Sequence, residues 1–160
     1  MKKVVWELSV KNSLIHFKVK YLRISNITGQ FLKFKGEVIA DEFFNHPQVH
    51  LFIDANSVGA IQHPVIEFNS VDGCRQSSGK IWELTGNVVA NEMKSPLTLV
   101  VNFSDIKEGR RKPTANFHLF GKISRKRIGL VCTDEEDVSD ELNIYAEIFL
   151  TMRPGSIDIS

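Results

Sequence analysis

The residues of this chain that could bind a metal ion or transfer a proton do not form a recognised motif. The sequence has five histidines, and none of them stands in an H-E-x-x-H zinc motif. His16, His50 and His118 fall on the polar sides of segments in which apolar and polar residues alternate. This pattern favours histidines that face solvent, with a metal site assembled across several strands as the alternative. No metal or other cofactor is expected.

Motifs for nucleophilic catalysis and phosphate binding are also missing from the sequence. It has no G-x-S-x-G element and no glycine-rich loop between a strand and a helix, and its scattered Ser, His and Asp residues do not define a triad. Cys74 and Cys132 are far apart and do not form a C-x-x-C pair. Two thiols in a reducing compartment are favoured over a disulfide. No catalytic residue is expected.

The charged residues give no reason to expect nucleic acid as a partner. Lys and Arg number 20 and Asp and Glu 19, a formal net charge of +1. Basic clusters at 110–112 and 125–127 are interpreted as solvated loops or a barrel rim, with contact to a ligand head group as the alternative for the second cluster. Phe17 lies on the opposite side of its segment from Lys18, whereas single-stranded nucleic acid needs aromatic and basic side chains on one face.

The composition predicts a single soluble domain over residues 1–160. Hydrophobic residues make up 42%, and Phe is over-represented, with eleven residues against two Trp and two Tyr. The N-terminal segment MKKVVWELSV has too short an apolar run for a secretory signal, and no segment approaches the ~20 apolar residues of a membrane span. A cytoplasmic location is expected.

Alternation of apolar and polar residues recurs along the chain and predicts an all-β fold of about eight or nine strands. With no segment of helical period, this pattern indicates an antiparallel sandwich or an up-and-down barrel. In the third predicted strand, Phe31 and Lys33 share one face and Phe34 lies on the other, with Gly29 and Gly36 as possible bends. The predicted strands are 4–10, 13–24, 29–41, 48–56, 63–70, 80–90, 96–104, 114–124 and 141–152.

The second of these segments, SLIHFKVKYL at 13–22, alternates throughout. Ile15, Phe17, Val19 and Tyr21 share one face, which is opposite to the polar one. That apolar face packs against a filled core, a second sheet or a cavity. The residues alone leave these three possibilities open, and a packed core is the simplest of them.

The order of these segments resembles the YceI-like family of lipid-binding antiparallel barrels, which are similar to lipocalins. Trp6 matches the early tryptophan of the family, and residues 13–41 match its long opening signature. VHLFIDANSV, HPVIEFNS, WELTGNVVA, GKISRKRIGL and VSDELNIYAEIFL follow in the family order. Each segment is a weak match alone, and their order and spacing together make the resemblance specific.

The chain departs from the family pattern in two places. Between Ser57 and Pro64 the family carries a longer, partly helical segment, which VGAIQH replaces here. The barrel mouth is then open, is covered by another segment, or belongs to a shortened chain. In addition, ANEMKSP replaces the usual apolar-Thr-Gly turn of the family.

The resemblance implies a barrel whose inward residues line a lumen for an apolar chain. Trp82 shares its parity with Leu84, and Trp82 and Tyr21 carry the donors suited to a ligand head group. Ten buried methylene groups would contribute about 8 kcal/mol. Parity along the predicted strands gives as lining residues Ile15, Phe17, Val19, Tyr21, Phe31, Leu51, Ile53, Ile66, Phe68, Trp82, Leu99, Val101, Phe103, Phe117, Leu119, Ile144 and Ile148.

We therefore interpret the chain as a non-enzymatic protein that binds a long-chain lipid such as an isoprenoid, a quinone tail or a fatty-acyl chain. Two alternatives remain: a structural or regulatory module with a packed core, and an enzyme acting on a small apolar substrate, which would need an inward carboxylate or histidine. A homodimer is a further possibility, because the outer face is expected to carry Phe52, Val65, Phe120 and Phe149.

Overall fold

The alternating segments form strands in the computed structural model, which describes residues 4–22, 25–40, 47–54, 65–71, 75–90, 92–108, 113–127 and 138–153. Of Tyr21 only the backbone is described. Within these ranges, one 3-10 turn, η1 (Val10–Asn12), interrupts the strands. The strands are β1 (Val4–Leu8), β2 (Leu14–Tyr21), β3 (Ser25–Phe31), β4 (Lys33–Ala40), β5 (Gln48–Asp54), β6 (Val65–Ser70), β7 (Arg75–Ser78), β8 (Ile81–Ala90), β9 (Met93–Glu108), β10 (Pro113–Ser124) and β11 (Val138–Met152).

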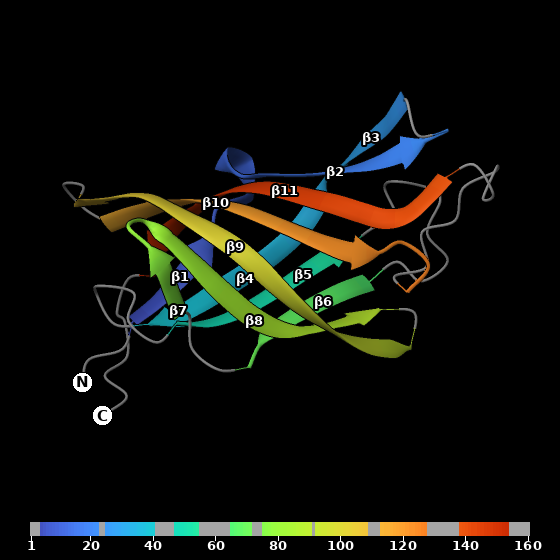
Figure 1. Ribbon diagram of the computed structural model, residues 1–160. Helices are drawn as coiled ribbons and strands as arrows, with labels where there is room; N and C mark the ends of the chain where they lie inside the picture. Colours follow the sequence, from blue (N-terminus) through green and yellow to red (C-terminus); the bar gives the residue numbers. More distant parts are fainter. Residues whose placement is uncertain are drawn as a thin grey trace.

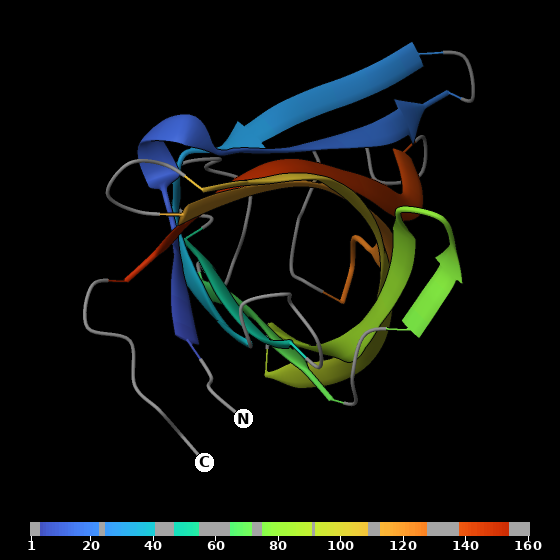
Figure 2. The ribbon, with the colours of Figure 1, turned by 90° about the vertical axis from the view of Figure 1, so that its left-hand side faces the viewer.

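Eight of the strands close into an antiparallel barrel, in the order β1-β4-β5-β6-β8-β9-β10-β11. β1 closes the ring because it pairs with β4 on one side and with the end of β11 on the other. Figure 2 looks along the barrel, and the strands surround one interior. The predicted all-β barrel is confirmed, and the sandwich is excluded because one sheet closes on itself.

The β2–β3 hairpin extends from one end of this barrel (Figure 1). β1 and β2 lie one after the other along β11, with η1 between them. Where η1 interrupts the pairing, the Ser13 hydroxyl accepts the backbone N–H of Phe149 at 2.9 Å. This bond replaces a missing ladder bond, so β11 stays continuous past the break.

The predicted strand 29–41 is wrong in its bounds, because the structure contains two strands there. β3 ends at Phe31 and β4 begins at Lys33, and Leu32 between them is 60% exposed. The break resets the alternation, so Phe31 and Phe34 are both buried although parity placed them on opposite faces. Neither glycine makes the bend. Gly29 lies beneath the ring of Phe17, and Gly36 faces Leu51.

Other boundaries also differ from the prediction. β7 was not predicted; it is a short strand that pairs only with β8. β9 begins at Met93 instead of 96, because its pairing with β8 continues to Ala90 opposite Met93. Glu92, in the turn, has a left-handed φ of 61°. These differences arise where pairing with a neighbouring strand, not alternation, fixes where a strand begins.

The inward face predicted from parity forms the core. Ile15, Phe17 and Val19 are at most 4% exposed, and Trp6 is completely buried. The same cluster includes inward residues of the other barrel strands, among them Ile53 and Phe68. The apolar face of β2 therefore faces the interior of the barrel. The end of the interior beside β2 is filled by side chains.

Candidate functional site: an apolar cavity in the barrel

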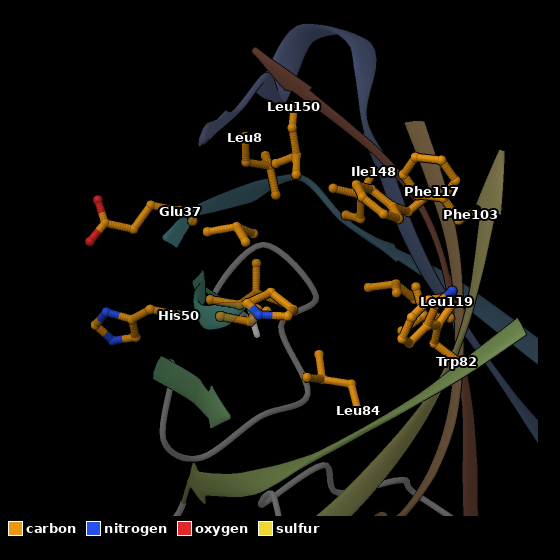
Figure 3. Close-up of a pocket in the computed structure, with 16 residues that line it drawn as sticks. Leu8, Glu37, His50, Trp82, Leu84, Phe103, Phe117, Leu119, Ile148 and Leu150 are labelled. Carbon is orange, nitrogen blue, oxygen red and sulfur yellow. The ribbon is translucent and has the colours of Figure 1, made fainter. Parts of the chain in front are cut away.

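A cavity of about 240 Å³ lies inside the barrel, toward the end where β5, β8 and β10 begin. Every barrel strand except β6 contributes to its wall, and the lining is almost entirely apolar. Figure 3 shows the side chains around a central space. The lining residues are Leu8, Gly36, Glu37, Val38, Pro47, Val49, His50, Leu51, Trp82, Leu84, Val101, Phe103, Phe117, Leu119, Ile148 and Leu150.

The predicted lining residues divide into two groups in the structure. Those that line the cavity are Leu51, Trp82, Val101, Phe103, Phe117, Leu119 and Ile148. The others pack in or against the core beyond the cavity: Ile15, Phe17, Val19, Phe31, Ile53, Ile66, Phe68, Leu99 and Ile144. The side chain of Tyr21 lies outside what the structure describes. Parity identifies the inward residues of the whole barrel, and the cavity occupies only one part of its length.

Several lining residues were missed by the sequence reasoning. Leu84, Val49 and Leu150 share the parity of predicted neighbours, so the alternation already contained that signal. Leu8 ends a short strand, in which too few residues alternate to assign the last one to a face. Gly36 contributes backbone instead of a side chain. The remaining missed residues are Glu37, Val38, Pro47 and His50.

A β-bulge places two aromatic rings together in the cavity wall. The register between β9 and β10 shifts so that Asn116 pairs with Asp105 but Phe117 pairs with Phe103. The two rings meet edge to face, with centroids 5.0 Å apart. Without the bulge Phe117 would stand opposite residue 104, so this irregularity completes the apolar wall.

The two titratable residues at the cavity edge direct their side chains away from it. Figure 3 shows the Glu37 carboxylate and the His50 imidazole pointing outward. Glu37 is 3.6 Å from Arg153, and His50 Nε2 is 2.9 Å from Glu67 Oε1. Hydrogen bonds from the Asn69 amide and from His50 lower the pKa of Glu67. The carboxylates of Glu37 and Glu67 therefore have their partners on the outer surface at this end of the barrel.

The histidines match the predicted polar faces where the structure describes them. His16 stacks on Tyr145 with ring centroids 5.3 Å apart, and His118 is exposed. His46 and His50 have the i, i+4 spacing that suits a metal site on a helix, but His50 lies in β5. No cluster of three or more metal-ligating side chains occurs among the described residues. His46, His63, Cys74, Cys132, the basic cluster 110–112 and the short connection 58–63 lie outside them.

The second basic cluster is not wholly a solvated loop, and that prediction is wrong for one residue. Arg125 is completely buried, whereas Lys126 and Arg127 are exposed. Arg125 continues the inward parity of Ile123 at the end of β10, and its Nε donates to the Ser139 carbonyl at 3.2 Å. This residue belongs to the filled end of the barrel and does not line the cavity.

Comparison with known proteins shows the fold to be that of YceI proteins. No family model matches the chain, and no curated protein sequence matches it. The structure is similar to that of BcnA from Burkholderia cenocepacia, with a TM-score of 0.72 and 18% identity, covering 89% of this chain and 98% of that one. It is also similar to the Campylobacter jejuni YceI protein, with a TM-score of 0.64 and 19% identity, covering 85% and 91%.

A third similar structure is a polyisoprenoid-binding domain from Saccharophagus degradans that is implicated in plant cell wall breakdown. Its TM-score is 0.62 and its identity 10%, and the match covers 94% of this chain and 99% of that domain. Among the described residues, no helix is long and apolar enough to cross a membrane.

Proposed function

We propose that this chain is a YceI-like protein that binds an apolar chain, such as an isoprenoid or acyl tail, inside its barrel. The cavity of about 240 Å³, walled by leucine, valine, isoleucine and aromatic side chains, is the observation that carries this proposal. Such a cavity favours hydrocarbon because transfer of apolar surface out of water is favourable and the wall offers few polar partners. The polyisoprenoid-binding domain with the same fold supports the proposal.

The volume of the cavity indicates how much binding free energy a buried hydrocarbon chain would contribute. A methylene group takes about as much room as a water molecule, roughly 30 Å³, so a cavity of about 240 Å³ holds about eight of them. At about 0.8 kcal/mol for each methylene, burial contributes about 6 kcal/mol, which corresponds to a dissociation constant of tens of micromolar before ordering costs. A polar head group at the mouth would add to this.

We infer that binding is not coupled to catalysis. General acid–base chemistry on a bound ligand needs an inward carboxylate or imidazole. Among the described residues that line the cavity, Glu37 and His50 are the only ones with such groups, and both point outward (Figure 3). The apolar tail of the ligand would be held by desolvation, in a protein that we place in the cytoplasm.

A homodimer belongs to the same proposal, through the outer face of the sheet. Val65 is 52% exposed, in keeping with its outward parity. Phe120 packs beside Tyr145 with ring centroids 5.1 Å apart, and Phe52 packs beside His50 at 4.5 Å. These neighbours cover part of each ring, so Val65 is the best position for a test. Val65→Lys should halve the solution mass of the dimer, and an unchanged mass would remove the reason for proposing one.

An extraction experiment tests the proposed function directly. Freshly purified protein is extracted with organic solvent, and the extract is analysed by mass spectrometry against a mock purification. A stoichiometric lipid would support the proposal and identify the ligand class. An empty extract, together with no binding of added prenyl or acyl alcohols, would contradict it and favour a structural or regulatory module with a packed core.

Adjacent residues with opposite orientation provide a matched pair of variants for this test. Val101 lines the cavity, whereas Val100 on the same strand is 39% exposed. Val101→Phe places a ring in the cavity, so lipid should be lost from the extract while the barrel remains folded. Val100→Phe adds the same ring on the outer face and should retain the lipid. Equal loss in both variants would show that the cavity is not the binding site.

A further inference from the structure

The cavity ends at a layer of packed side chains part of the way along the barrel. On β4, β5 and β9, the inward residue two positions beyond a lining residue belongs to this layer. Phe34 follows Gly36 in this way on β4, and Ile53 follows Leu51 on β5. Leu99 follows Val101 on β9. All three layer residues are at most 9% exposed, so the layer is closed to solvent.

Phe68 supplies a second ring to this layer from β6, the barrel strand that contributes nothing to the cavity wall. It is 4% exposed and pairs with the lining residue Leu51. Its ring lies over Gly86, where an added Cβ would approach Phe68 Cζ to 2.6 Å. Gly86 itself is two positions beyond the lining residue Leu84. The ring therefore occupies the space into which the cavity would otherwise continue.

The interior beyond this layer is filled in the same manner. The ring of Phe17 lies over Gly29, and it packs against Phe31 with ring centroids 5.2 Å apart. In the layer itself, Leu99 on β9 fills the space beside Gly121 on β10, where an added Cβ would approach Leu99 Cδ2 to 2.6 Å. Large side chains set against glycines are a close-packed arrangement, which does not open without moving several residues.

From this arrangement we propose that the layer containing Phe68 is a chain-length stop. It limits the buried part of a ligand to about eight to ten carbons, the length that about 240 Å³ accommodates. The preferred ligand is then an amphiphile with one or two isoprene units or a medium-length acyl chain. In a longer ligand the excess carbons remain outside the mouth. This inference rests on the proposed function and adds a limit on ligand length.

A series of straight-chain alcohols tests the stop in the wild-type protein. Dissociation constants are measured by calorimetry for chains of about four to fourteen carbons, each below its aggregation concentration. While the chain still enters the cavity, each added methylene should tighten binding about fourfold. Beyond about eight to ten carbons the gain should cease, because further methylenes stay in water.

Two phenylalanine variants locate the stop. Phe68→Ala removes the ring and should move the plateau to chains about two or three carbons longer. Phe52→Ala removes the same ring from the outer face of the adjacent strand, where Phe52 pairs with Glu67, and should leave the plateau unchanged. Phe68→Leu serves as a milder variant if Phe68→Ala does not fold, with a shift of about one carbon in the same direction.

The outcomes separate this inference from the proposed function. If no alcohol binds at any length, the proposed function is overturned and the stop with it. If affinity rises fourfold per methylene through the whole series, the lumen is continuous, and the stop is overturned while the proposed function stands. A plateau that Phe68 variants do not move would overturn the role of this layer. A plateau that moves in the Phe68 variants alone supports the stop.

Discussion

The aromatic ring of Phe68 lies in the space that a side chain at Gly86 would need. A Cβ on Gly86 would come within 2.6 Å of Phe68 Cζ and closer still to the backbone carbonyl oxygen of Asn69. Both contacts are far shorter than van der Waals distance, and the second involves backbone, which cannot rotate away. Glycine at this inward position therefore lets a phenylalanine ring from β6 fill the barrel.

Gly86→Ala should consequently destabilise the protein by about 1–3 kcal/mol, the usual cost of overpacking a core. Urea unfolding followed by circular dichroism measures this loss. Thr85→Ala is the matched control, because Thr85 is the exposed neighbour on the same strand and should change stability by less than about 0.5 kcal/mol. Equal stability of Gly86→Ala and wild type would mean that the Phe68 ring does not occupy this space.

The two tryptophans of the chain should report differently on ligand binding. Trp82 lines the cavity and is half-buried, whereas Trp6 is completely buried in the core. A bound alkyl chain displaces water from the indole of Trp82, so decanol should shift the emission spectrum to shorter wavelength. Trp82→Phe should abolish this shift, and Trp6→Phe should retain it. A shift that persists in Trp82→Phe would place the ligand elsewhere.

Asp140 should make part of the stability depend on pH in the acidic range. Burial raises the pKa of its carboxyl, but the Lys126 backbone N–H and the Ser124 hydroxyl outweigh burial, so the pKa lies below its ordinary value of 3.8. The two hydrogen bonds measure 3.0 and 2.7 Å. Because the folded pKa is the lower one, the unfolded state binds more protons, and this contribution is lost as pH falls through 3.8 and then through the folded pKa.

The test of this dependence compares wild type with Asp140→Asn by urea unfolding at neutral pH and near pH 3. The wild type should exceed the variant in stability at neutral pH, and the difference should shrink in acid, where the carboxyl of the wild type becomes protonated. Glu141→Gln, at an exposed neighbour, controls for the general effect of removing a negative charge. A difference that is constant with pH would show that the Asp140 carboxylate is not stabilised in the folded state.

Alternation along the chain predicted the barrel and its inward face well, because side chains of a strand alternate strictly between two environments. Ile15, Phe17 and Val19 are buried as expected, and Val101 and Leu119 reach the cavity. The sequence did not reveal where the interior is hollow. Alternation distinguishes inward from outward residues. The position of the cavity along the barrel axis depends instead on where rings such as Phe68 fill the interior by packing against glycines of other strands.

Local irregularities were the other features that the sequence concealed. The break at Leu32 and the bulge that pairs Phe117 with Phe103 each shift the alternation by one residue, and no distinctive residue type marks them. Arg125 was expected in a charged loop because its neighbours are basic. Its burial follows from the inward parity of β10, which the predicted end of that strand at residue 124 already contained, but the basic neighbours favoured a charged loop.

The buried position of Arg125 leads to a final prediction, for the filled end of the barrel. Its Nε donates to the Ser139 carbonyl, and its backbone N–H donates to the Asp140 carbonyl at 2.6 Å, so it connects the end of β10 to the start of β11. Arg125→Met keeps much of the side-chain length but removes the donors, which leaves a part-buried carbonyl without this partner. We expect a loss of about 2–4 kcal/mol in the free energy of unfolding.

Lys126→Met is the matched control, because it makes the same replacement at the exposed next residue and should cost less than about 0.5 kcal/mol. Decanol affinity should change little in Arg125→Met as long as the variant folds, because Arg125 does not line the cavity. Arg125 would have no structural role at this end of the barrel if the two variants proved equally stable. A large loss of affinity with little loss of stability would instead mean that the guanidinium contacts the ligand.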